Sequence, residues 1–74
     1  MSVFYFHVRW GDVIYLDHEG VALLDLRAAW DHAREDAREL FRLSRDDVTT
    51  ERWIEIDDGR GHLVATAPAG ATFH

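Results

Sequence analysis

Histidine and carboxylate side chains, the types that bind metal ions and transfer protons, lie close together in the first part of this sequence. His7 interrupts an apolar run, and Asp17, His18 and Glu19 follow it as three adjacent residues. The sequence contains neither two histidines four residues apart nor any Cys, so the spacing of a local chelating motif is missing. We therefore expect no built-in metal site and no cofactor. The alternative is a small ligand- or metal-binding domain that uses His7 together with Asp17, His18 and Glu19.

Glu55 and Asp57 are the second candidates for chemistry, because two carboxylates on one face of a strand can act as acid and base. The sequence offers them no marked nucleophile: it has no Gly-x-Ser-x-Gly motif and no glycine-rich phosphate loop before a helix. We expect a protein that is not an enzyme and has no catalytic residues.

Residues 3–9 alternate as in a strand that has one wholly apolar face. Phe4, Phe6 and Val8 form that face and are expected in the core. The opposite face must pack against something other than the helix, because the single predicted helix already packs on the apolar face. Together with a later strand it supplies the interface candidates, with Arg52 at their rim: Val3, Tyr5, His7, Arg9, Trp53 and Glu55.

Residues 26–43 predict an amphipathic helix, for which Asp25 is a suitable N-cap because its carboxylate can accept from free backbone N–H groups. This segment contains neither Gly nor Pro. The residues expected to face the sheet recur at helical spacing: Leu26, Ala29, Trp30, Ala33, Ala37, Leu40 and Phe41.

Four strands surround this helix in the sequence. After residues 3–9, a turn at Gly11 leads to a return strand at 13–16, and residues 52–57 form a hairpin with residues 62–67. Gly59 is expected to supply the positive φ of that hairpin turn. Residues 21–24 predict an irregular segment, and Pro68 ends the last strand, which leaves residues 68–74 as a loose tail.

The order of elements predicts one α+β domain over residues 1–74. Two hairpins joined by a helix give a ββαββ arrangement, with a four-stranded, mostly antiparallel sheet and the helix packed on one face. A sheet of this kind leaves its other face without a helix. We expect the chain to associate with a second copy through that face or through an edge strand.

The charge and composition of the chain limit the kinds of molecule that it is expected to bind. The 74 residues carry a formal net charge of -6, and all 8 basic residues are Arg, so the surface repels phosphate backbones and anionic lipids. We expect no binding to nucleic acid or membranes, and the absence of Cys and of long apolar runs favours the cytoplasm. A domain this small gains from burying surface against a partner, so we expect a homodimer or a complex with another small protein.

The sequence also resembles a small bacterial family known only as a domain of unknown function. The resemblance rests on Phe-Tyr-Phe-His-Val at residues 4–8, Asp17-x-x-Gly20, Asp25-Leu26 before an alanine-spaced helix, and Trp-Ile-Glu-Ile-x-Asp at residues 53–58. It implies a single sheet-plus-helix domain and no particular activity. Together these features predict a non-enzymatic protein-interaction module that self-associates through its sheet.

Overall fold

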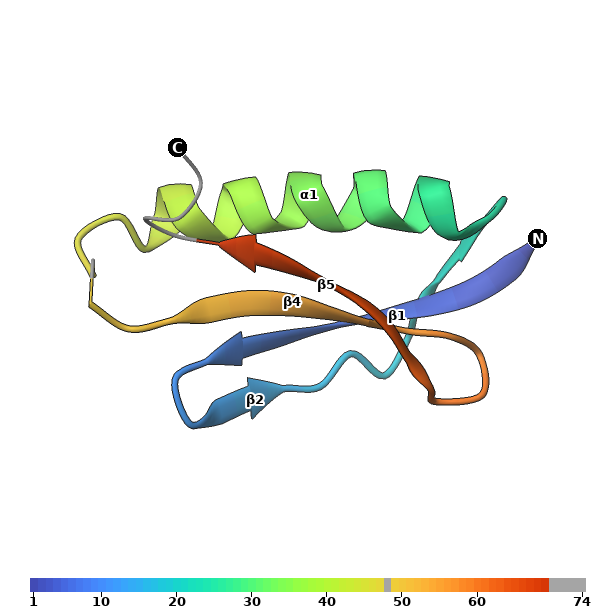
Figure 1. Cartoon of the computed structure of the whole chain (residues 1–74), viewed down its shortest axis with the longest axis horizontal. Helices are drawn as coiled ribbons and strands as arrows, with labels where there is room; N and C mark the ends of the chain where they lie inside the picture. The colour runs from blue at the N-terminus through green and yellow to red at the C-terminus, as the bar shows by residue number, and fades with distance from the viewer. Residues whose placement is uncertain (48, 70–74) are drawn as a thin grey trace.

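One helix packs on an antiparallel sheet of five strands in the computed structural model, which describes residues 1–47 and 49–69 (Figure 1). The α+β class and the helix on one face of the sheet are confirmed, and one strand is added to the predicted ββαββ order. The elements are β1 (Ser2–Trp10), β2 (Val13–Tyr15), β3 (Val21–Leu23), α1 (Leu26–Leu43), β4 (Arg52–Asp57) and β5 (Leu63–Ala69).

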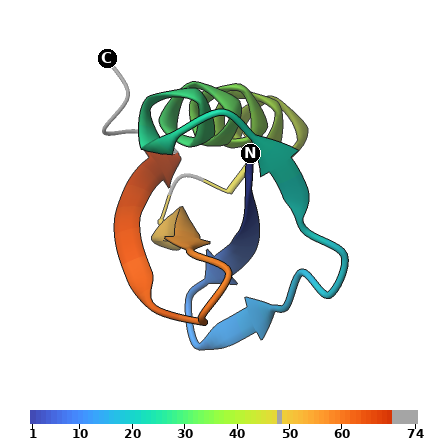
Figure 2. The same cartoon turned by 90° about the vertical axis from the view of Figure 1, so that its right-hand side faces the viewer.

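β1 organises the sheet. One of its sides pairs with β4, which pairs in turn with β5, while its other side pairs with β2 along one half and with β3 along the other half. Figure 2, a view along the helix, shows that the sheet curves until β3 and β5 approach the helix from its two sides, whereas β2 lies far from it. The helix therefore covers one part of the sheet and leaves the region of β2 uncovered.

The added strand corrects the prediction of an irregular segment at residues 21–24. Val21 pairs with Phe4, and Leu23 pairs with Ser2, so β3 completes the hydrogen-bonded ladder along the first half of β1. Both side chains also pack against the core. A three-residue run is too short for its alternation to be recognised in the sequence, and the tertiary pairing decides its structure.

The helix begins and ends as predicted. The Asp25 carboxylate accepts a hydrogen bond from the Ala28 N–H at 2.9 Å, which caps the first turn. At the other end, the Ser44 N–H donates to the Leu40 carbonyl oxygen at 3.0 Å. Leu26 is the exception on the predicted inner face: it is 46% exposed, because the buried positions of the helix begin only at Ala29.

Alanines form the contact between helix and sheet. Ala29, Ala33 and Ala37 are fully buried, and their short side chains let the helix lie close to the strands. Trp30 and Leu40 pack against this cluster while remaining partly exposed. The buried core is Phe4, Phe6, Ala29, Ala33, Ala37, Ile54, Ile56, Ala67 and Ala69.

The hairpin between β4 and β5 differs from its prediction in one detail. The residue with positive φ is Gly61, at 79°, and not Gly59. Asp58 closes the turn, since its N–H donates to the His62 carbonyl oxygen and its own carbonyl oxygen accepts from the Gly61 N–H. A bulge between Ile56 and Asp57 shifts the register at the same end.

β5 continues through Pro68 to Ala69, so the predicted loose tail does not begin at residue 68; residues 70–74 lie outside the described part of the chain. Backbone direction explains why Pro68 does not end the strand. Backbone N–H and C=O groups point to alternate sides along a strand, and the Phe6 N–H points away from β4. The backbone groups of odd-numbered β1 residues therefore point toward β4, so Arg9 bonds to Trp53. Trp53 is thus engaged with β1, and Pro68 opposite it faces the open edge, where an N–H is not needed.

Candidate functional site

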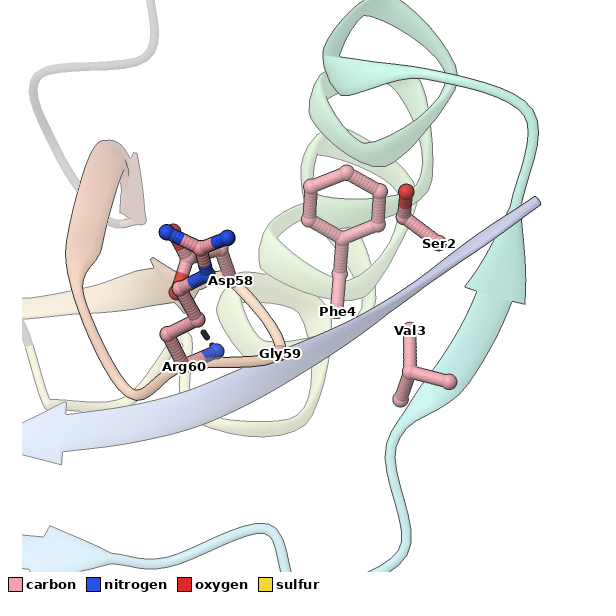
Figure 3. A pocket seen from close by; sticks show the side chains of 6 residues that line it. All are labelled: Ser2, Val3, Phe4, Asp58, Gly59 and Arg60. Atoms are coloured by element: carbon pink, nitrogen blue, oxygen red, sulfur yellow. Dashed lines mark hydrogen bonds between the residues drawn. The ribbon is translucent and has the colours of Figure 1, made fainter.

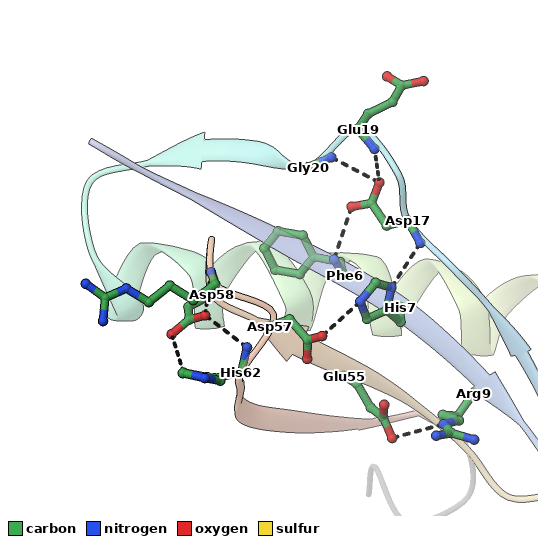
Figure 4. A network of polar contacts seen from close by, with 11 residues as sticks. Phe6, His7, Arg9, Asp17, Glu19, Gly20, Glu55, Asp57, Asp58 and His62 are labelled. Carbon is green, nitrogen blue, oxygen red and sulfur yellow. Dashed lines mark hydrogen bonds and ion pairs between the residues drawn. The ribbon is translucent and has the colours of Figure 1, made fainter.

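His7 lies in the middle of β1 on the sheet face opposite the helix, and both of its ring nitrogens have partners (Figure 4). Nε2 lies 3.1 Å from Oδ2 of Asp57, and Nδ1 accepts a hydrogen bond from the Asp17 backbone N–H at 3.0 Å. A neutral imidazole with its proton on Nε2 satisfies both contacts. The side chain is only 12% exposed, so His7 has no free nitrogen directed toward solvent.

The Asp17 carboxylate replaces a strand partner in the gap between β2 and β3. Its Oδ2 accepts from the Phe6 N–H at 3.1 Å, and its Oδ1 accepts from the N–H groups of Glu19 and Gly20. Burial alone would raise the pKa of Asp17, but these three backbone hydrogen bonds outweigh it and hold the pKa below its ordinary value. Asp17 therefore holds backbone groups of the sheet in place. The sequence did not indicate this role, because the adjacent His18 and Glu19 made Asp17 look like a metal ligand.

Gly20 completes this segment. Its φ is 73°, and a Cβ at this position would lie 2.6 Å from Cγ1 of Val3 and 3.0 Å from Cε1 of Tyr5. Only glycine combines the positive φ with so close an approach. The spacing Asp17-x-x-Gly20 thus presses residues 17–20 against Val3 and Tyr5, which covers part of the face predicted to be open.

Glu55 is the second polar centre of this face. Its Oε2 accepts from Nε of Arg9 at 3.1 Å and from Nε1 of Trp53 at 3.0 Å. The register places Glu55 opposite His7 and Trp53 opposite Arg9. The predicted interface residues therefore share one face, as expected, but three of them, Arg9, Trp53 and Glu55, bond to one another.

Arg52 does not lie at the rim of that face. It points to the helix side of the sheet, is 3% exposed, and donates to the carbonyl oxygens of Thr50 (2.8 Å) and Ser44 (3.2 Å). Its guanidinium carbon lies 5.3 Å from the ring centroid of Trp10 and 5.9 Å from that of Phe41. The alternation of Arg52 with Ile54 was the signal for this position, and the residue ties the end of α1 to β4.

A shallow groove of about 330 Å³ lies between the start of β1 and the turn from β4 to β5 (Figure 3). Arg60 and Asp58 supply its charges, and the Asp58 carboxylate already accepts from the backbone N–H groups of Arg60 and His62. The groove also contains the Ser2 hydroxyl. It is lined by Ser2, Val3, Phe4, Asp58, Gly59 and Arg60.

The described residues contain no group of three or more His, Asp or Glu side chains placed to hold a metal ion. His18 and Glu19 are exposed, and the groups of His7 and Asp17 that would bind a ligand are hydrogen-bonded within the sheet. Within residues 1–47 and 49–69, no helix is long and apolar enough to cross a membrane. The geometry thus gives the ligand-binding alternative no specific support.

The comparison with protein families gives a match over nearly the whole chain. The model of the domain of unknown function DUF6894 matches residues 3–70. Neither the curated proteins nor the solved structures contain a match. The chain belongs to the DUF6894 family.

Proposed function

We propose that this member of the DUF6894 family is a non-enzymatic interaction module that self-associates through its sheet. The observation that carries the proposal is the exposed apolar surface of β2 and the residue after it. Val13 is 50% exposed, Tyr15 is 59% exposed and Leu16 is 55% exposed. Apolar side chains gathered on an uncovered edge strand are a typical association surface.

The polar groups of the sheet support this function over a chemical one. His7 and Asp57 bond to each other, Asp17 bonds to backbone N–H groups, and Glu55 is shared by two donors. A catalytic or ligand-binding group needs at least one polar atom directed toward its substrate. In this sheet the same atoms maintain the strands in position.

The modest core supports association as well. Ile54 and Ile56 are the largest fully buried side chains, and much of the remaining core consists of alanine. A domain of 74 residues without disulfides gains stability when it buries further apolar surface against a partner. A second copy of the chain supplies such a surface in a two-fold dimer.

Sedimentation velocity over a concentration series tests the proposal. We expect a monomer–dimer equilibrium in the micromolar range and a melting temperature that rises with protein concentration. Substituting lysine for both Val13 and Tyr15 should yield a folded monomer, because these side chains are exposed. A wild-type chain that stays monomeric at the highest concentrations would contradict self-association.

A further inference from the structure

We infer that a second copy of the chain binds along the open edge of β2, antiparallel to it, with the two-fold axis at Ile14. This inference rests on the proposed self-association and specifies the surface and the register. It joins the two sheets into one continuous sheet. The direction of the backbone groups of β2, the side chains that the register brings together and the proline at the other sheet edge all favour this arrangement.

The backbone of β2 presents Ile14 to the open edge. Gly11 and Asp12 form a two-residue turn that pairs Trp10 with Val13, and the φ of Gly11 is 58°. In such a turn the flanking residues bond to each other, so Val13 and Tyr15 direct their backbone groups toward β1. The N–H and C=O of Ile14 therefore point away from the sheet.

Two hydrogen bonds outside the regular ladder confirm the backbone directions along β1. The Phe6 N–H donates to Asp17, on the side of β2 and β3. The Gly11 N–H donates to the Glu51 carbonyl oxygen at 2.8 Å, on the side of β4. The backbone N–H and C=O groups of even-numbered β1 residues thus point toward β2 and β3, which agrees with the pairing of Trp10 with Val13.

The register centred on Ile14 brings complementary side chains together. Val13 of one copy lies opposite Tyr15 of the other, and the contact occurs twice because of the two-fold axis. A β-branched residue opposite an aromatic one is a favourable cross-strand pair. Asp12 falls opposite Leu16, so the register opposes no like charges. Both side chains of the repeated contact are half exposed or more in the single chain.

The other edge of the sheet is less suited to pairing. Pro68 faces outward from β5 and has no N–H to donate, so a strand added there would lose a hydrogen bond in the middle of its ladder. Proline is one of the means by which edge strands avoid association. Residues 13–16 contain no proline and no charge. The second copy therefore prefers β2.

A single cysteine tests the position of the axis, because the natural chain has none. Hydrogen-bonded residues in an antiparallel ladder have Cα atoms about 5.5 Å apart, within the range of about 4.4–6.8 Å that a disulfide spans. Ile14→Cys should therefore form a disulfide-linked dimer under mild oxidation. Thr66→Cys is the matched control, since Thr66 is exposed and faces the open edge of β5. It should form no disulfide-linked dimer, although the chains still associate without a covalent bond.

The register has its own test at the exposed positions. A mixture of Val13→Cys and Tyr15→Cys chains should cross-link, whereas either variant alone should not, because identical positions are then two residues out of register. Circular dichroism checks that each variant is folded. Cross-linking of Thr66→Cys, or of Val13→Cys alone, would overturn the inference.

The two proposals fail in distinguishable ways. A wild-type chain that dimerises in sedimentation while Ile14→Cys and the mixed variants do not cross-link would overturn the β2 register and leave self-association standing. A wild-type chain that remains monomeric would overturn both proposals.

Discussion

The two edges of the sheet, β2 and β5, are built in different ways. The inward-facing alanines of β5, from Ala65 to Ala69, pack below the helix, and Pro68 interrupts its outward-facing donors. β2 is a three-residue strand far from the helix, with half-exposed Val13 and Tyr15 (Figure 1). Both edges thus retain exposed apolar side chains, including Leu63 on β5, but only β5 carries a proline at its outward-facing positions.

This contrast indicates that different residues determine the stability of the fold and the association of two chains. Residues near β4 and β5 maintain the fold, because the helix buries them there. Residues of β2 contribute less to the fold and remain available to a partner. A substitution on the helix-covered side should therefore change the free energy of unfolding, and one on the β2 side should change the assembly.

Two isoleucines test this separation most directly. Ile56→Ala removes a fully buried side chain from β4, and we expect a loss of about 2–5 kcal/mol in the free energy of unfolding. Ile14→Ala is the matched variant in β2, where the side chain is only partly buried, and its cost should stay near 1 kcal/mol. Urea unfolding at low protein concentration measures both. Equal losses would show that β2 belongs to the core as fully as β4 does.

Two glycines test how firmly the segment after β2 is held. Gly20 and Gly61 both have positive φ, so alanine at either position should cost about 1–2 kcal/mol from backbone strain. At Gly20 the added Cβ also meets Val3 and Tyr5, whereas at Gly61 no atom lies within 4 Å. Gly20→Ala should therefore be less stable than Gly61→Ala by a further ~1–3 kcal/mol. Equal melting curves would mean that residues 17–20 move away from β1 at little cost.

Acid should loosen the turns at both ends of the sheet. Hydrogen bonds from the backbone of Thr50, and then from other donors including Nε1 of Trp10, lower the pKa of Asp47 to about 2. Hydrogen bonds also lower the pKa of Asp17 and, chiefly from the backbone N–H groups of His62 and Arg60, that of Asp58.

A carboxylate with a lowered pKa in the folded state contributes stability above its unfolded pKa, and this contribution is lost as the pH falls through the folded value. Chemical unfolding measured at falling pH should thus show stability declining from about pH 4 toward pH 2. Asp47→Asn should reduce the slope in this interval. Asp36 acts in the opposite direction, because burial raises its pKa. A stability that stays constant to pH 2 would contradict the hydrogen bonds assigned to Asp47.

The parts of the structure that follow from local chemistry were predictable from the sequence. The Asp25 cap, the alanine stripe and the alternation around Ile54 identified the helix and the central strands. The residues named for the outer face do lie on one face, because alternation in β1 and β4 determines them, but Arg52, expected at its rim, points to the helix side. β3 was missed because its structure depends on pairing with a distant strand, and three residues have no distinctive period.

Roles that depend on tertiary distance were harder to predict. Asp17 resembled a metal ligand because its neighbours are His18 and Glu19, yet its carboxylate bonds to Phe6, eleven residues earlier in the chain. Pro68 resembled the end of a strand because the sequence alone does not show which edge its nitrogen faces. Both corrections depend on the curvature and order of the strands.

Pro68→Val should reverse the difference between the edges with the smallest effect on the fold. The position is exposed and directs its backbone away from β4, so valine keeps the strand and restores an N–H at the open edge. The free energy of unfolding should change by less than about 0.5 kcal/mol, as for most surface substitutions.

The assembly should change instead. A chain that can pair at both β2 and β5 forms open polymers, because each added copy leaves another edge free. Light scattering should therefore show species larger than a dimer for Pro68→Val, and Pro68→Ala should show the same tendency more weakly, since alanine favours strands less than valine does. If both variants keep the wild-type size distribution, Pro68 is not what protects β5, and the helix beside that edge must be sufficient.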